Sequence, residues 1–171
     1  MTTTDWTIDL ALIGIVFLQV RDRRLSLRLL LLPVALCAWA AVTYLRGVPT
    51  AGNDLLLVAL CLGAGVALGA LAGAYTKVTT GPDGHPLSRA GTAAATFWVV
   101  GVGARFAFQL YATHGGASHI ASFSASHSIT STAAWTAALV LMAIGEALVR
   151  TGVVAYRGYV LAPAAAGGQQ A

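Results

Sequence analysis

Long apolar runs follow one another along the 171-residue chain, and runs of this length are typical of segments that cross a lipid bilayer. Hydrophobic residues make up 57% of the chain and charged residues 9%, whereas an ordinary soluble domain carries about 25% charged residues. The five runs are Trp6 to Val20, Leu29 to Leu45, Leu55 to Tyr75, Gly91 to Ala112 and Ala133 to Val149. The pattern predicts an all-α polytopic membrane bundle of five transmembrane helices.

A single transmembrane domain is predicted over residues 1–162, followed by a tail of small and polar residues, 163–171, that we expect to be disordered. The first run is the shortest, carries Asp9 and resembles the apolar core of a signal peptide. No positively charged segment precedes it, and a second apolar run follows closely. We therefore interpret 6–20 as a helix of the domain.

In a five-span arrangement, the basic residues outside the apolar runs fall almost entirely on one side of the membrane. Eight of them fall in the segments after the first, third and fifth runs: Arg21, Arg23, Arg24, Arg28, Lys77, Arg89, Arg150 and Arg157. The segments on the other side carry only Arg46. Because positive charge is retained on the cytoplasmic side, the N-terminus is predicted outside and the C-terminus in the cytoplasm.

Two local patterns concern packing and connection. Gly65, Gly69 and Gly73 recur every four residues and form a stripe along which another helix backbone can approach closely. The stripe either packs inside the bundle, which we favour, or joins two copies of the chain as a homodimer. Between the third and fourth runs, β-branched residues precede the turn Pro82-Asp83-Gly84 and predict a short cytoplasmic hairpin.

Arg105 stands within the fourth apolar run and is the main candidate for a functional site. An arginine near the centre of a membrane helix costs about 2.5 to 3.5 kcal/mol on insertion scales, so it usually faces a partner or a cavity. Asp9 is the preferred partner by depth, and Asp54 is the second choice. Glu146 is expected near the inner surface, about 10 Å deeper than Arg105, and to meet Arg150 at the next helical turn instead.

Three histidines, His114, His119 and His127, lie in the segment 113–132 between the last two runs. Imidazoles bind metal ions and haem iron, but spacings of five and eight residues match no helical ligand pair. A polar, flexible linker outside the membrane is the simpler interpretation, and no cofactor is assigned.

Several classes of function are disfavoured by the absence of their motifs. The chain has no nucleophile elbow, metalloprotease motif or dinucleotide fingerprint, so no enzymatic activity is predicted. Its basic residues flank apolar runs and form no aromatic-interleaved patch, so nucleic acid is not an expected partner. Cys37 and Cys61 are embedded in apolar runs and are predicted to be structural thiols.

The order of these features resembles the CcdC-like family of small bacterial membrane proteins. The likeness covers roughly residues 8–155. It includes the arginine-rich segment leading to Pro33, the glycine-rich span ending in Thr76-Lys77-Val78, and Trp98 followed seven residues later by Arg105. The resemblance implies an accessory protein of the bacterial inner membrane, related to cytochrome maturation, and supplies no catalytic residues.

Two functions are therefore carried forward. The first is an integral membrane accessory or interaction protein whose partners are the bilayer and other membrane proteins. The second is a small transporter or ligand-binding protein in which Arg105 binds an anion, such as a carboxylate or a haem propionate.

Overall fold

The structure, a computed structural model, describes residues 23–24, 27–44, 49–80 and 86–161. The predicted first helix, 6–20, with its Asp9, and the predicted tail, 163–171, lie outside the described residues. The elements in chain order are β1 (Arg23–Arg24), α2 (Leu27–Tyr44), α3 (Asp54–Tyr75), β2 (Thr76–Thr80), β3 (Pro86–Ala90), α4 (Thr92–Thr113), α5 (Ala117–Ser126), α6 (Thr132–Tyr156) and the π-helical turn η1 (Arg157–Leu161).

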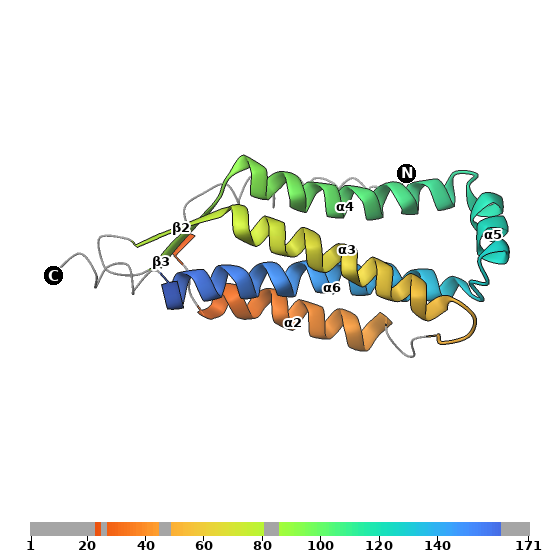
Figure 1. The fold of residues 1–171 in the computed structure, drawn as a ribbon, viewed down its shortest axis with the longest axis horizontal. Coiled ribbons are helices and arrows are strands. Elements are labelled where there is room, and N and C mark those ends of the chain that lie inside the picture. Colours follow the sequence, from red (N-terminus) through yellow and green to blue (C-terminus); the bar gives the residue numbers. More distant parts are fainter. Residues whose placement is uncertain (1–22, 25–26, 45–48, 81–85, 162–171) are drawn as a thin grey trace, which may run out of the picture.

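Most of the described chain is helical, and the long helices lie lengthwise beside one another (Figure 1). Three of them, α3, α4 and α6, are long and apolar enough to cross a membrane. Their exposed faces carry leucine, valine and phenylalanine side chains, among them Leu60, Val100 and Phe106. The prediction of a mostly helical chain with helices of membrane-spanning length is thus confirmed. The helices of the second to fifth runs begin within two residues of their predicted starts.

α3 and α6 form the central pair of the bundle and run in the same direction. Their starts are tied together, because the amide of Asn53 donates to the carbonyl of Ser128 at 2.9 Å. Val58 of α3 packs with Ala137 and Ala138 of α6 in the buried core. α2 contacts α6, and α4 contacts α3, so the central pair is covered on two sides.

The glycine stripe of α3 faces α6 of the same chain. A Cβ atom on Gly65 would lie 2.1 Å from the carbonyl oxygen of Met142, and one on Gly69 would lie 2.4 Å from that of Glu146. At Gly73 the nearest atom would be Cβ of Val153, at 2.8 Å. The stripe therefore packs inside the bundle, which is the interpretation favoured above. These three glycines are not on a free surface that could join two copies.

The predicted hairpin between α3 and α4 is present as β2 and β3. The two strands are antiparallel, with Lys77 opposite Arg89 and Val78 opposite Ser88. β1 adds a third strand to the far side of β3, which gives the order β1-β3-β2. Pairing between Arg23 and Ser88 brings the arginine-rich segment before α2 beside the hairpin, at the end of the bundle where α3 and α6 finish.

The opposite end of the bundle is closed by α5. Residues 113–132 were expected to be a flexible linker, and that interpretation is wrong for 117–126, which form a helix. The serine, alanine and histidine residues of this segment form no long apolar run, so its hydropathy does not indicate a helix. The indole of Trp135 donates to the hydroxyl of Ser124 at 3.0 Å and stacks on Phe108, which fastens α5 to α4 and α6.

Candidate functional site

Arg105 forms a buried ion pair with Glu146. The guanidinium nitrogen Nη1 lies 2.8 Å from the carboxylate oxygen Oε2, across the space between α4 and α6. The side chain of Glu146 is 3% exposed and that of Arg105 is 19% exposed. A charge-assisted hydrogen bond of this length is stronger than a neutral one, and it offsets part of the cost of burying both charges.

Two glycines make room for Glu146, one beside its carboxylate and one beside its backbone. Gly101 lies one helical turn before Arg105 on α4, and a Cβ atom there would be 2.4 Å from Oε2. Gly69 lets α3 approach the backbone of the residue itself. Glu146 is therefore held where three helices meet, and its position depends on small residues in two of them.

The second carboxylate oxygen has no hydrogen-bond partner. Oε1 of Glu146 is a buried side-chain oxygen without a partner among the described residues. A Cβ atom on Gly101 would lie 2.7 Å from it, so the α4 backbone already closes one side. An unpartnered oxygen in such a place is destabilising by about 1 to 3 kcal/mol, and it can accept a further hydrogen bond.

Glu146 is not too deep to reach Arg105, and the prediction that it is too deep is wrong. The last apolar run ends at Val149, but α6 continues through Arg150 to Tyr156. Glu146 thus lies ten residues before the end of α6, and Arg105 lies thirteen residues after the start of α4. At a rise of about 1.5 Å per residue, the two positions differ in depth by only about 4 to 5 Å, which a long arginine side chain spans.

The other two partner candidates do not contribute to this contact in the described structure. Asp9, the preferred partner, lies outside the described residues. Asp54, the second choice, is completely buried at the start of α3 and binds Thr130 instead. Its Oδ1 accepts from the Thr130 amide at 2.8 Å and its Oδ2 from the Thr130 hydroxyl at 2.5 Å. Asp54 therefore connects α3 to the segment before α6.

Each of the three histidines contacts a different group, and none contacts another. Nδ1 of His119 lies 2.8 Å from the hydroxyl of Tyr111, while the ring of His127 stacks on Phe123 at 4.0 Å between ring centroids. His114 bonds within its own turn, to the carbonyl of Leu110. Within the described ranges no three His, Cys, Asp or Glu side chains gather as metal ligands. The structure gives each imidazole a local contact and brings none of them to Arg105.

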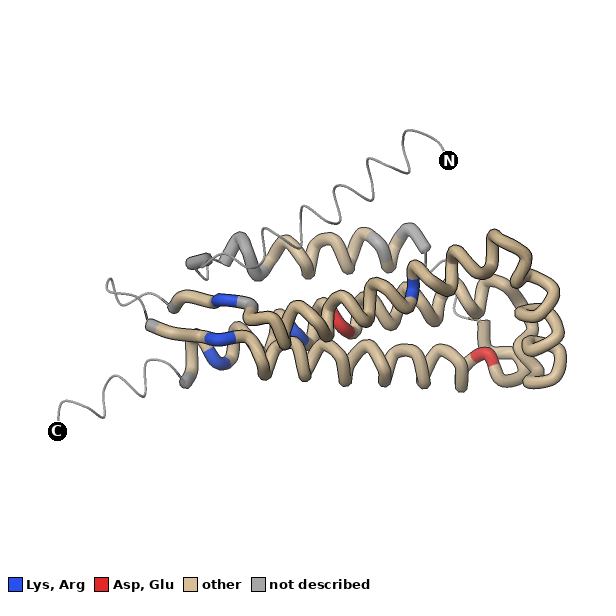
Figure 2. Tube along the Cα trace, turned by 90° about the horizontal axis from the view of Figure 1, so that it is seen from above, with Lys and Arg blue, Asp and Glu red and all other residues tan. Residues whose placement is uncertain are grey.

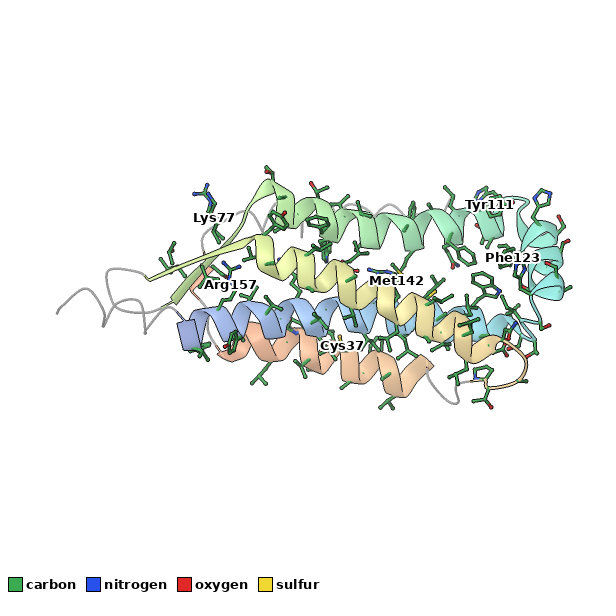
Figure 3. All side chains as sticks on the ribbon, in the orientation of Figure 1. Cys37, Lys77, Tyr111, Phe123, Met142 and Arg157 are labelled. Atoms are coloured by element: carbon green, nitrogen blue, oxygen red, sulfur yellow. The ribbon has the colours of Figure 1, made fainter. Side chains whose placement is uncertain are left out.

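Arg157 has a role that sequence reasoning missed. Its Nη1 donates to the carbonyls of Gly73, Ala74 and Thr76 at 3.0, 2.6 and 2.8 Å. These carbonyls lie at the end of α3, where helix geometry leaves oxygens without intrahelical donors. Figure 3 shows the side chain lying between the end of α3 and the π-helical turn. Arg157 was counted only as an orienting charge, because a contact across more than 80 residues leaves no local signal.

The site holds one acid, Glu146, in an ion pair with Arg105 and in electrostatic interaction with a second, largely buried base, Arg150. The arrangement fixes the rotation of α4 relative to α6, and it leaves one carboxylate oxygen and part of a guanidinium able to meet a further group. No family model, no curated protein and no solved structure matches the chain. The CcdC-like resemblance therefore stays a prediction.

Proposed function

We propose that the chain is a five-span integral protein of a bacterial inner membrane that serves as an accessory or interaction subunit without catalysis. Three helices of suitable length and apolarity support the membrane part of this proposal. The basic residues of the described chain gather mainly at the end that carries the strands (Figure 2). Positive charge at one end favours that end as the cytoplasmic side, with the N-terminus outside.

Topology reporters test the orientation. A phosphatase fused after residue 171 should be inactive, and a fluorescent reporter at the same place should be bright, because the former needs the exterior and the latter the cytoplasm. The same two reporters inserted between Gly115 and Gly116, before α5, should show the reverse pattern. A bright signal before α5 with an active phosphatase at the C-terminus would contradict the orientation.

The accessory role rests on one observation: the charge of Arg105 is neutralised within the chain by Glu146 at 2.8 Å. An arginine that binds a ligand would be expected to keep its charge directed to an open site, whereas this one links two helices. The CcdC-like resemblance suggests cytochrome maturation as the process served. The apolar helix faces offer surface both to lipid and to partner membrane proteins.

A neutral replacement of the whole pair tests this role. In a strain lacking the protein, we expect the double variant Arg105→Met/Glu146→Leu to restore c-type cytochromes, measured by haem staining, as well as the original chain does. Replacing a buried ion pair by apolar residues of similar volume is often neutral or stabilising. Membrane abundance by immunoblot is the matched control, because it separates loss of function from loss of protein.

The second candidate is binding of an anion by Arg105, and a specific observation favours it. The guanidinium side chain keeps 19% of its surface exposed, so a carboxylate or haem propionate has access to it. On this alternative, the double variant reaches normal abundance but leaves the strain without c-type cytochromes. A deletion strain with unchanged c-type cytochromes would remove the maturation role from both candidates.

A further inference from the structure

The carboxylate of Glu146 is bound at only one of its two oxygens. Nη1 of Arg105 donates to Oε2 at 2.8 Å, whereas Oε1 is buried without a hydrogen-bond partner among the described residues. The contact is therefore a single hydrogen bond and not the two-bond fork that a guanidinium often forms with a carboxylate. Because buried polar atoms are nearly always hydrogen-bonded, Oε1 calls for a donor.

Arg105 brings unused donors to the same place. A guanidinium carries five N–H donors, and the described part of the chain gives that of Arg105 one partner, Glu146. The Arg105 side chain is 19% exposed, and the apolar residues Phe106 and Leu110 on the same helix are exposed as well. A ligand that satisfies the pair thus carries one donor for Oε1, one acceptor for the guanidinium, and an apolar body.

The elements around Glu146 supply two positive charges. α4 contributes Arg105, and α6 itself contributes Arg150, which lies one helical turn after Glu146 and interacts electrostatically with it. α3 approaches with Gly69, and on α2, which contacts α6, the described titratable side chain is the thiol of Cys37. The carboxylate charge is compensated in this setting, but a second ionised carboxylate beside Oε1 would meet a like charge.

The depth of Arg105 limits the form in which a ligand can arrive, if α4 spans a bilayer. Arg105 lies eight residues before the end of α4, or about 12 Å at about 1.5 Å per residue. An ionised carboxylate pays a large desolvation cost at this depth, whereas a protonated carboxyl group pays only the cost of a neutral polar group. A carboxylic acid with an apolar tail can therefore reach Arg105 from the lipid in its protonated form.

We propose that Arg105 and Glu146 bind the carboxyl group of an amphiphilic carboxylic acid together with its proton. The O–H of the ligand donates to Oε1, and its carbonyl oxygen accepts from a free N–H of Arg105. Two carboxyl groups this close cannot both stay ionised, so they share one proton. This inference rests on the membrane function proposed above and specifies the ligand of its second candidate.

Binding then takes up a proton from solution. Above the usual carboxyl pKa of about 4 to 5 the free ligand is ionised, so each bound molecule gains one proton and forms one O–H bond. Uptake of a single proton raises the apparent Kd about tenfold for each pH unit. A site for a simple anion has no such dependence between pH 6 and pH 8, because its ligand stays ionised.

The test is calorimetric titration of the purified full-length protein in a neutral detergent with decanoate, with titration into detergent alone subtracted. The original chain is expected to bind decanoate about 100-fold more weakly at pH 8 than at pH 6. Buffers of different protonation enthalpy should report uptake of about one proton per molecule bound. Decyl sulfate, which stays ionised, and methyl decanoate, which has no donor, should bind about tenfold more weakly than decanoate at pH 6, or weaker still.

Three variants locate the proton at Oε1. Glu146→Gln keeps the size of the side chain and offers an N–H to an ionised carboxylate, so its Kd for decanoate should change less than about twofold between pH 6 and pH 8. Gly101→Ala would place a methyl 2.7 Å from Oε1 and should lose binding. Gly103→Ala, whose methyl meets nothing within 4 Å, is the matched control and should bind like the original chain.

Three results would overturn the site. These are an equal Kd for decanoate at the two pH values in the original chain, decyl sulfate binding as tight as decanoate binding, and an unchanged pH dependence in a folded Glu146→Gln variant. The first two need no substitution, so they decide even if a variant does not fold. Release of the protein from membranes by carbonate contradicts the membrane function itself, whereas retention with any of the three results contradicts only the shared-proton site.

Discussion

Alanine in place of Gly69 is expected to lower the free energy of unfolding by about 1 to 3 kcal/mol, the usual cost of forcing an extra carbon into a packed interior. The added methyl would stand 2.4 Å from the carbonyl oxygen of Glu146, which is backbone and does not move aside as a flexible side chain does. α3 and α6 must then separate along their contact. Gly65→Ala should lower the free energy of unfolding similarly, because its methyl would lie 2.1 Å from the carbonyl oxygen of Met142.

Gly63 supplies the matched control on the same helix. A Cβ atom there meets nothing within 4 Å, so Gly63→Ala adds the same methyl without a clash. Because alanine favours a helix over glycine by up to about 1 kcal/mol, this variant should be neutral or more stable. Thermal unfolding in one detergent measures all three, and equal stability of Gly63→Ala and Gly69→Ala would contradict the close contact of α3 with α6.

Removing Arg105 alone is expected to be the most damaging change to the ion pair. Loss of one partner from a buried pair costs about 3 to 5 kcal/mol, and the electrostatic interaction of the largely buried Arg150 with the same carboxylate places the expected cost at the lower end of that range. Arg105→Met leaves the carboxylate of Glu146 at 3% exposure with neither oxygen partnered. Glu146→Leu should cost less, since the 19% exposed guanidinium sits on a flexible stem that reaches toward a polar surface.

The double variant completes the cycle. Arg105→Met/Glu146→Leu should be more stable than Arg105→Met, and a coupling energy of at least about 1 kcal/mol is expected for residues in direct contact. Gly101→Ala gives an independent check, because its methyl would displace the carboxylate, whereas Gly103→Ala meets nothing within 4 Å. Strictly additive single changes, measured by unfolding in the same detergent, would mean that the 2.8 Å contact does not contribute to stability.

The helices were predictable because apolar length and segment boundaries are local properties of a sequence. The run Leu55 to Tyr75 becomes α3, Asp54–Tyr75, and the β-branched residues after it become strand β2, which pairs with β3. The stripe of glycines likewise indicated a close helix contact. In each of these cases the residues that carry the signal are also the residues that form the element.

The site was less predictable because its partners are brought together by distant segments. Glu146 was assigned to a helix end on the assumption that Arg150 marks the membrane surface, yet α6 continues for six residues beyond that charge. The strand β1 and the capping of α3 by Arg157 depend on pairing with remote residues, 23 with 88 and 157 with 73. Hydropathy along the chain carries no information about such pairings.

The pairing of α3 with α6 also sets an order on biosynthesis. β2, β3, α4 and α5 lie between them in the chain, so α6 is completed 81 residues after α3 ends. At about 5 to 20 residues per second, the ribosome needs about 4 to 16 s to make that stretch. Until residues 130 and 142 have been synthesised within this interval, Thr130 cannot cover the carboxylate of Asp54 and Met142 cannot cover the glycine stripe. α3 must therefore remain beside the insertion machinery or in lipid until α6 has been synthesised.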